Sequence, residues 1–105
     1  MQRYRLKYHP EAEKDLLSIY HFIERYAGDL SARRRLGEIE QTTYRLKSFP
    51  KIGTARDTLK PRLRILPCGD AAVICFTVDD ETLTVTILCI SYAGSDWEAR
   101  VKERQ

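Results

Sequence analysis

The chain has 105 residues, of which 43% are hydrophobic and 31% are charged, a composition that excludes disordered and membrane-embedded classes. This length allows one small hydrophobic core, so we expect a single domain over residues 1–105. The net charge of +3 is compatible with a nucleic acid or an acidic protein as partner.

The apolar runs and the cysteines indicate where the protein works. The longest apolar run, residues 71–76, is much shorter than the roughly 20 residues that cross a bilayer. Cys68, Cys75 and Cys89 form no C-x-x-C pair and cannot all be bridged within one chain. We therefore expect a cytoplasmic protein that contacts no membrane. Because only two histidines accompany the cysteines, without metal-ligand spacing, we expect no metal and no cofactor.

The first two elements are a strand and a helix. Residues 3–8 alternate basic and apolar side chains, which is typical of a strand with one buried face. Pro10 stands where a helix would begin, and Gly28 can end that helix with a left-handed cap. The helix is predicted to end near Ala27. Its apolar stripe, at spacings of three and four, consists of Ala12, Leu16, Ile19, Ile23 and Tyr26.

A second amphipathic helix follows after a turn of two or three residues, with Ser31 as its expected cap. Its stripe consists of Ala32, Leu36, Ile39, Thr43 and Leu46. Two helices joined by so short a turn are expected to form an antiparallel hairpin. Pro50 and Gly53 end the second helix, and residues 51–60 are predicted to be a basic loop.

Three strands are then predicted over residues 63–66, 71–78 and 82–92, with turns at 68–70 and 79–81. In the last strand, Leu83, Val85, Ile87 and Cys89 are expected to face one way. Ser95 with Glu98 forms a capping-box pattern that predicts a short helix through about residue 102. The whole is an α+β fold (β-α-α-β-β-β) in which a helical hairpin packs on an antiparallel sheet.

Basic residues are concentrated between positions 33 and 64. Arg33, Arg34 and Arg45 are expected to form a solvated helix face, because exposed arginines on helices commonly do so. The loop and the strand after it carry arginines that can converge on one edge of the sheet and contact a partner. These arginines are Arg56, Arg62 and Arg64.

Three further side chains are candidates for partner contact. Leu17 and Tyr44 point away from their helix stripes, so they are expected to be exposed and available to a partner. Trp97 either anchors the last helix on the sheet or forms an interface hot spot.

Several motifs together resemble the ParE and RelE toxins, a superfamily that includes plasmid stabilisation proteins. They are A-x-x-D-L-x-x-I-x-x-F-I at residues 12–23, L-x-x-x-P-x-x-G at 46–53, L-R-I at 63–65 and I-x-Y-A-G-x-D-W at 90–97. The resemblance implies a RelE/ParE-like fold and a toxin held inactive by a cognate antitoxin. It also implies that ParE-type members poison DNA gyrase and that RelE-type members cut mRNA on the ribosome.

The choice between these branches depends on the site residues. The resemblance implies that a nuclease site would use Arg62 and Arg64 as cations and Tyr92 to handle the proton. Nuclease-type members carry a further basic residue at about the place of residues 94–96 of this chain. Here Asp96 would instead repel phosphate. The ParE-like branch, a gyrase inhibitor, is therefore favoured. Two alternatives remain: a ribosome-dependent endoribonuclease and a non-toxic protein-interaction domain. Of these functions, only the endoribonuclease would make the protein an enzyme.

Overall fold

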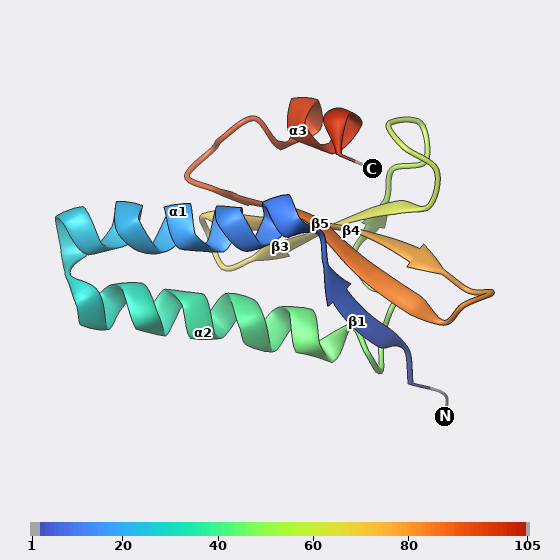
Figure 1. Cartoon of the computed structure of the whole chain (residues 1–105), viewed down its shortest axis with the longest axis horizontal. Helices are drawn as coiled ribbons and strands as arrows, with labels where there is room; N and C mark the ends of the chain where they lie inside the picture. The colour runs from blue at the N-terminus through green and yellow to red at the C-terminus, as the bar shows by residue number, and fades with distance from the viewer. Residues whose placement is uncertain (1–2, 105) are drawn as a thin grey trace.

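The computed structural model describes residues 3–104, which form helices on both faces of one sheet (Figure 1). In chain order the elements are β1 (Arg5–Tyr8), α1 (Pro10–Ala27), α2 (Asp29–Arg45), β2 (Thr54–Ala55), β3 (Leu63–Cys68), β4 (Ala72–Asp79), β5 (Thr84–Tyr92) and α3 (Trp97–Glu103). The order predicted from the sequence is confirmed, and the two-residue strand β2 is an addition to it.

Helix α1 begins and ends as its sequence predicts. Pro10 occupies the first turn, and the ring nitrogen Nδ1 of His9 accepts a hydrogen bond from the backbone N–H of Glu11. Gly28 ends the helix at the predicted residue, but its φ of 91° and ψ of 169° are not the left-handed conformation predicted for this cap. The predicted stripe is wrong at its end, because Tyr26 is 63% exposed. It also omitted Asp15, which is buried.

Helix α2 starts at Asp29, immediately after Gly28, so a single residue makes the turn of the hairpin. The predicted cap at Ser31 is therefore wrong: Ser31 lies inside the helix, and Gly28 stands at the cap position without a capping side chain. The stripe itself is confirmed, with Ala32, Ile39 and Leu46 buried.

The strands form a five-stranded sheet in the order β1-β5-β4-β3-β2. The pairs β2–β3, β3–β4 and β4–β5 are antiparallel. β1 instead lies parallel to β5, with Arg5 beside Thr84 and Tyr8 beside Ile87. The α+β class is confirmed, and the parallel edge strand is a feature that the sequence pattern did not specify. The helical hairpin follows β1 in the chain, so β1 is not tied by a tight turn to the next strand and can lie at the edge of the sheet beside β5.

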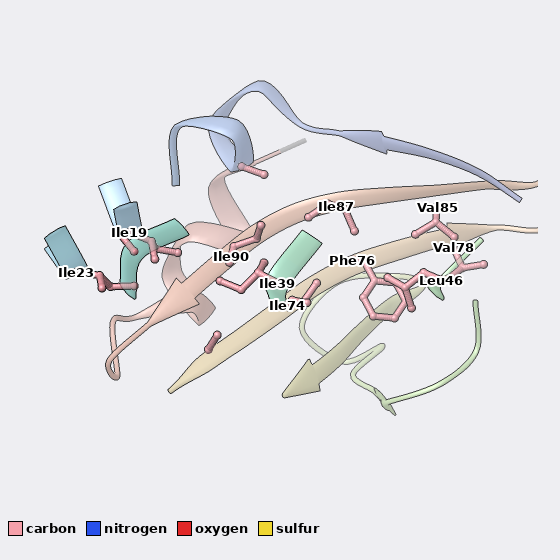
Figure 2. Close-up of a cluster of buried hydrophobic side chains, with 13 residues drawn as sticks. Ile19, Ile23, Ile39, Leu46, Ile74, Phe76, Val78, Val85, Ile87 and Ile90 are labelled. Atoms are coloured by element: carbon pink, nitrogen blue, oxygen red, sulfur yellow. The ribbon is translucent and has the colours of Figure 1, made fainter. Parts of the chain in front are cut away.

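The helical hairpin covers one face of the sheet through the larger hydrophobic cluster of the protein. Figure 2 shows Ile19, Ile23 and Ile39 from the helices meeting side chains of β4 and β5. Phe76 at the centre of β4 is fully buried, and burial of such a side chain contributes about 1.5–3 kcal/mol. The hairpin thereby leaves the opposite face of the sheet to α3.

A β-bulge changes which side of β5 faces the hairpin. Cys75 pairs with Cys89 and Phe76 with Ile87, so Leu88 is an extra residue in β5. Ile87 and Ile90 face the hairpin, while Leu88 and Cys89 pack on the other face. The predicted uniform alternation is therefore wrong at Cys89.

Helix α3 packs on the second face, where Val101 joins a smaller hydrophobic cluster with Leu63, Ile65 and Leu88. In Figure 1 α3 lies at the top and α2 at the bottom, with strands between them. The predicted cap at Ser95 is wrong, because the carboxylate of Asp96 accepts the hydrogen bond from the N–H of Ala99. None of the helices in residues 3–104 has the length and apolar character needed to cross a lipid bilayer.

Candidate functional site

The predicted basic edge lies where β3 meets the tip of the β4–β5 hairpin. Arg62, Arg64 and Lys51 line one hollow of 360 Å³ there. The same hollow is lined by four acidic residues: Asp57, Asp79, Asp80 and Glu81. Arg62 pairs with Asp79 at 3.4 Å, and Lys51 pairs with Asp80 at 3.0 Å. Arg62 and Arg64 therefore converge as expected, but Arg56 does not join them, and acids of the hairpin tip pair with Arg62 and Lys51.

Arg64 uses its guanidinium to hold the loop before β2. Its Nε donates to the carbonyl of Ile52 at 3.1 Å, and one terminal nitrogen donates to the carbonyls of Lys51 and Gly53. Three carbonyls around one guanidinium leave it little freedom to meet a substrate. The contacts indicate a structural function for Arg64.

Arg62 has an unfavourable backbone conformation and a largely exposed side chain. Its φ is +67°, a value that costs a side chain other than glycine about 1–2 kcal/mol. The carboxylate of Asp57 accepts a hydrogen bond from its N–H at 3.0 Å and supports this conformation. Its side chain is 64% exposed. Residues other than glycine that are held in such strained backbone conformations cluster at functional sites, so Arg62 is a candidate functional residue.

Arg56 lies on the α3 side of the sheet, where its guanidinium carbon is 5.5 Å from the centre of the Trp97 ring. Trp97 is half-buried and packs against the smaller cluster. Of the two functions expected for Trp97, its contacts agree with the anchor. The stacked pair also presents a cation and an aromatic edge at the surface.

The two side chains predicted to be exposed on the hairpin are exposed, Leu17 by 59% and Tyr44 by 55%. Tyr44 lies between two cations, with Arg3 at 5.6 Å and Lys47 at 5.0 Å from its ring centre. The hydrogen bond from Arg3 lowers the pKa of the Tyr44 phenol. Neither residue borders the hollow that holds Arg62 and Arg64.

Tyr92 lies away from Arg64 along the sheet, at the end of β5. In the register of β4, Arg64 is beside Phe76 and Tyr92 beside Ala72, four residues apart, or about 13 Å at 3.3 Å per residue. The Tyr92 hydroxyl is 3.4 Å from that of Tyr26. This hydrogen bond raises the pKa of Tyr92, so the phenol is less readily ionised to the phenolate that would act as a general base. The structure thus does not bring together the residues of the expected nuclease site.

A groove that the sequence reasoning missed lies between α1 and the segment 93–95. Its volume is 470 Å³, and Ile19, Phe22 and Ile90 supply apolar lining. Arg25 and Arg100 add cations to the same groove, and Tyr92 lines it beside Phe22, with ring centres 5.9 Å apart. The groove therefore combines an apolar lining with Arg25 and with Arg100, which is paired with Asp15 of the same lining.

A buried carboxylate closes one end of this groove. Asp15 of α1 accepts hydrogen bonds from the N–H of Ile90, from Arg100 at 3.1 Å and from Arg104 at 2.6 Å. It ties α3 to α1 across the edge of the sheet. Its place between Ala12 and Ile19 on the buried stripe is the sequence feature that could have revealed it.

The cysteines do not form a reactive centre. Cys75 and Cys89 are fully buried opposite each other in β4 and β5. The hydrogen bond with Cys89 and burial raise the pKa of the Cys75 thiol, so it stays protonated. Within residues 3–104, no three histidine, cysteine or carboxylate side chains gather closely enough to hold a metal ion.

Residues 6–97 match the family described as ParE toxin of type II toxin-antitoxin system, parDE. The fold is similar to a chain of the chromosomal ParDE system of P. aeruginosa (TM-score 0.74, 23% identity, 87% of this chain and 97% of that one). It is also similar to a chain of the RelBE2 toxin-antitoxin complex of Mycobacterium tuberculosis (0.65, 19%, 88% and 93%). A mutant of the E. coli toxin RelE in the free state matches as well (0.64, 14%, 97% and 96%). No curated protein sequence matches the chain.

Proposed function

Because the chain belongs to the family of ParE toxins of type II toxin-antitoxin systems, we propose that it stops growth by binding DNA gyrase and that a cognate antitoxin neutralises it. The observation that carries this choice of target is the separation of Arg64 from Tyr92, which lie beside β4 residues four positions apart, Phe76 and Ala72. Metal-free RNA cleavage needs cations and a proton-handling group around one phosphate. Membership of a toxin family also sets aside the non-toxic interaction domain.

The segment before α3 supports the same choice. Asp96, at the position where nuclease-type relatives carry a base, is exposed and uses its carboxylate to cap α3. The hydroxyl of Ser95 accepts a hydrogen bond from Arg100 at 2.6 Å. A carboxylate at this place would repel an RNA phosphate, whereas it is compatible with a protein target.

The proposed gyrase contacts are Arg62 and the Arg56–Trp97 pair. Arg62 keeps a strained backbone and a largely exposed guanidinium, and Arg56 with Trp97 offers the residue types that dominate protein interfaces. Arg64 supports this surface indirectly by holding the loop 51–53.

An Arg62→Gly variant separates contact from stability. Glycine relieves the positive φ, and the exposed pair with Asp79 contributes only about 0–1 kcal/mol, so the variant should stay folded. Purified full-length protein should block supercoiling by host gyrase, and Arg62→Gly should need at least about tenfold more protein for the same block. Arg34→Ala, on the exposed side of α2, is the matched control. Absence of any effect of excess wild-type protein on gyrase would refute the target.

We propose the groove between α1 and the segment 93–95 as the main antitoxin site. Its apolar lining and the cation of Arg25, which forms no ion pair within residues 3–104, suit a segment that carries apolar and acidic side chains. Leu17 and Tyr44 extend the exposed apolar surface of the hairpin and are proposed to contact the same partner.

Charge reversal at Arg25 tests the antitoxin site. Arg25→Glu should weaken binding of the antitoxin encoded in the adjacent reading frame by about tenfold or more, measured by calorimetry. Lys14→Glu, on the exposed part of α1 outside the groove, should bind within about twofold of wild type. Equal binding by the two variants would remove the groove from the interface.

A ribosome-dependent endoribonuclease is the second candidate, and one observation favours it. Arg25, Arg100 and Tyr92 line the same groove, so a cationic site with a phenol exists, although not where the sequence predicted it. This function requires cut transcripts in a translating extract and loss of cutting in Tyr92→Phe. Intact transcripts during growth arrest would exclude it.

A further inference from the structure

The sheet face that carries α3 has a second, open half, which is cationic and rich in threonine. Lys7 of β1 lies beside Thr86 of β5, which pairs with Thr77 of β4. One step nearer the hairpin tip, Arg5 lies beside Thr84, which pairs with Asp79. We call these two rows, together with Lys60 and Arg62 at their border, the threonine shelf.

The side chains of the shelf point away from the helical hairpin. Leu6 and Tyr8 of β1 pack into the larger cluster on the hairpin side, so the residues that alternate with them face the other way. Two open hollows, of 390 and 380 Å³, lie on the shelf, and Lys7, Thr77 and Thr86 line both of them. Lys60 lines the second hollow and Arg62 the first.

The charge of the shelf is positive and largely unneutralised. Within residues 3–104 neither Lys7 nor Lys60 forms an ion pair. Asp79 is the acid on the two rows, and it already pairs with Arg62 and accepts hydrogen bonds from the N–H groups of Glu81 and Thr82. The other acid at the hairpin tip with ion-pair contacts, Asp80, is bonded to Tyr4 and Lys51.

We infer that the threonine shelf binds the phosphate backbone of duplex DNA. Lysine and arginine with threonine hydroxyls are the side chains that contact phosphates in protein–DNA complexes. Arg5 and Lys7, two residues apart on one strand, are separated by about 6.6 Å, close to the spacing of successive phosphates. The cations and hydroxyls of the two rows suit contacts with the backbone of a duplex, although Tyr8 and His9 line one of the hollows.

The inference goes beyond the proposed function, because gyrase acts on DNA and a toxin that contacts both would hold its target where the duplex is bound. It does not depend on gyrase, since binding to free DNA is measured without the enzyme. Backbone contacts alone carry no sequence information, so the shelf should bind unrelated duplexes with similar affinity.

The test is fluorescence anisotropy of a labelled duplex with full-length protein over a range of salt concentrations. Arg62 is paired with Asp79, so Arg5, Lys7 and Lys60 are the cations expected to contact phosphates. Three such contacts predict a slope of about −2.7 when the logarithm of the association constant is plotted against the logarithm of the salt concentration. The Lys7→Gln, Lys60→Gln double variant should reduce the magnitude of that slope by about 2 and weaken binding at least about tenfold at low salt. Both lysines are outside the core, and an unchanged thermal unfolding curve would show that the variant is folded.

The matched control is Arg34→Gln with Arg45→Gln, which removes the same charge from the exposed side of α2. Its affinity and slope should stay close to those of wild type. Equal weakening by both double variants would mean that net charge alone attracts the DNA, and the inference would be wrong. It would also be wrong if the shelf variant kept its affinity for DNA but lost its antitoxin, since the shelf would then be a protein-docking surface.

The gyrase assay distinguishes the two proposals. Shelf-dependent DNA binding without gyrase inhibition would leave this inference standing and remove the proposed target. Gyrase inhibition by a wild-type protein that does not bind duplex DNA would do the reverse.

Discussion

At the scale of single residues, the function of a side chain depends on what it already bonds. Arg64 matches a motif shared with toxins, yet its guanidinium is bonded to three backbone carbonyls of the loop 51–53. Arg62, two residues earlier, has the strained backbone and the exposed side chain. The sequence shows two similar arginines, and only the hydrogen bonds tell them apart.

Arg64→Ala should therefore lower the free energy of unfolding by about 1–3 kcal/mol, because partly buried carbonyls lose a charged donor. Urea unfolding followed by circular dichroism measures this loss. Arg34→Ala, whose side chain is exposed, should change stability by less than about 0.5 kcal/mol. Wild-type stability in Arg64→Ala would contradict a structural function.

Tyr8 predicts an alkaline pH dependence. Burial raises the pKa of its phenol above the ordinary value of 10.0, so the folded state favours the neutral form. The stabilisation is fully present below pH 10 and is lost as pH rises through the folded-state pKa. Tyr8→Phe, which loses the hydrogen bond with Thr43, should cost about 0.5–1.5 kcal/mol at pH 7. The gap between wild type and variant in thermal unfolding should narrow above pH 10; a constant gap would contradict the burial effect.

At the scale of elements, the helices could be predicted from the sequence because their apolar side chains recur every three or four residues. The first residues of α2 and α3 could not, because neighbouring residues compete as caps. Ser31 and Ser95 are good capping types, but Gly28 turns the chain earlier and Asp96 caps α3 instead. The bulge at Leu88 left no mark in the sequence, because one extra residue changes the facing of β5 without changing its composition.

Two glycines in different elements should respond to alanine with opposite signs. Gly53 has a φ of +85°, and a Cβ there would lie 2.5 Å from the carbonyl oxygen of Ile65. Gly37 lies in α2, with no atom within 4 Å of an added Cβ. Gly37→Ala should stabilise the protein by about 0.5–1 kcal/mol, and Gly53→Ala should destabilise it by more than about 1 kcal/mol. If Gly37→Ala and Gly53→Ala shifted the melting temperature in the same direction, the predicted difference between the two glycines would be contradicted.

At the scale of the whole molecule, several features of the candidate site depend on contacts between residues far apart in the sequence. The sequence alone could not predict these features. Convergence of Arg62 and Arg64 could be foreseen from their alternate positions near one strand. The pairing of Arg62 with Asp79 and of Lys51 with Asp80 could not, because only the folded sheet brings the hairpin tip near these cations. The groove beside Tyr92 was missed for the same reason, since it forms between α1 and the segment before α3.

The Asp15 cluster joins α1, β5 and α3, so its loss should be felt beneath α3. Asp15→Asn leaves Arg104, whose side chain is only 11% exposed, without its counter-charge, at a cost of about 3–5 kcal/mol. The loosened helix should expose Cys75 and Cys89, and a thiol reagent should modify them under native conditions at least about tenfold faster than in wild type. Glu11→Gln breaks an exposed pair with Lys14 and should leave the rates unchanged. Equal protection in Asp15→Asn would show that α3 does not depend on this carboxylate.

The parallel pairing of β1 with β5 has a consequence for the time at which the toxin can act. During synthesis, β1 leaves the ribosome first but stays unpaired until residues 84–87 have also emerged. Asp15 waits still longer, for Arg100 and Arg104. A nascent chain therefore completes these contacts only after Arg104 has emerged from the ribosome, so most of the chain is made before the fold is closed.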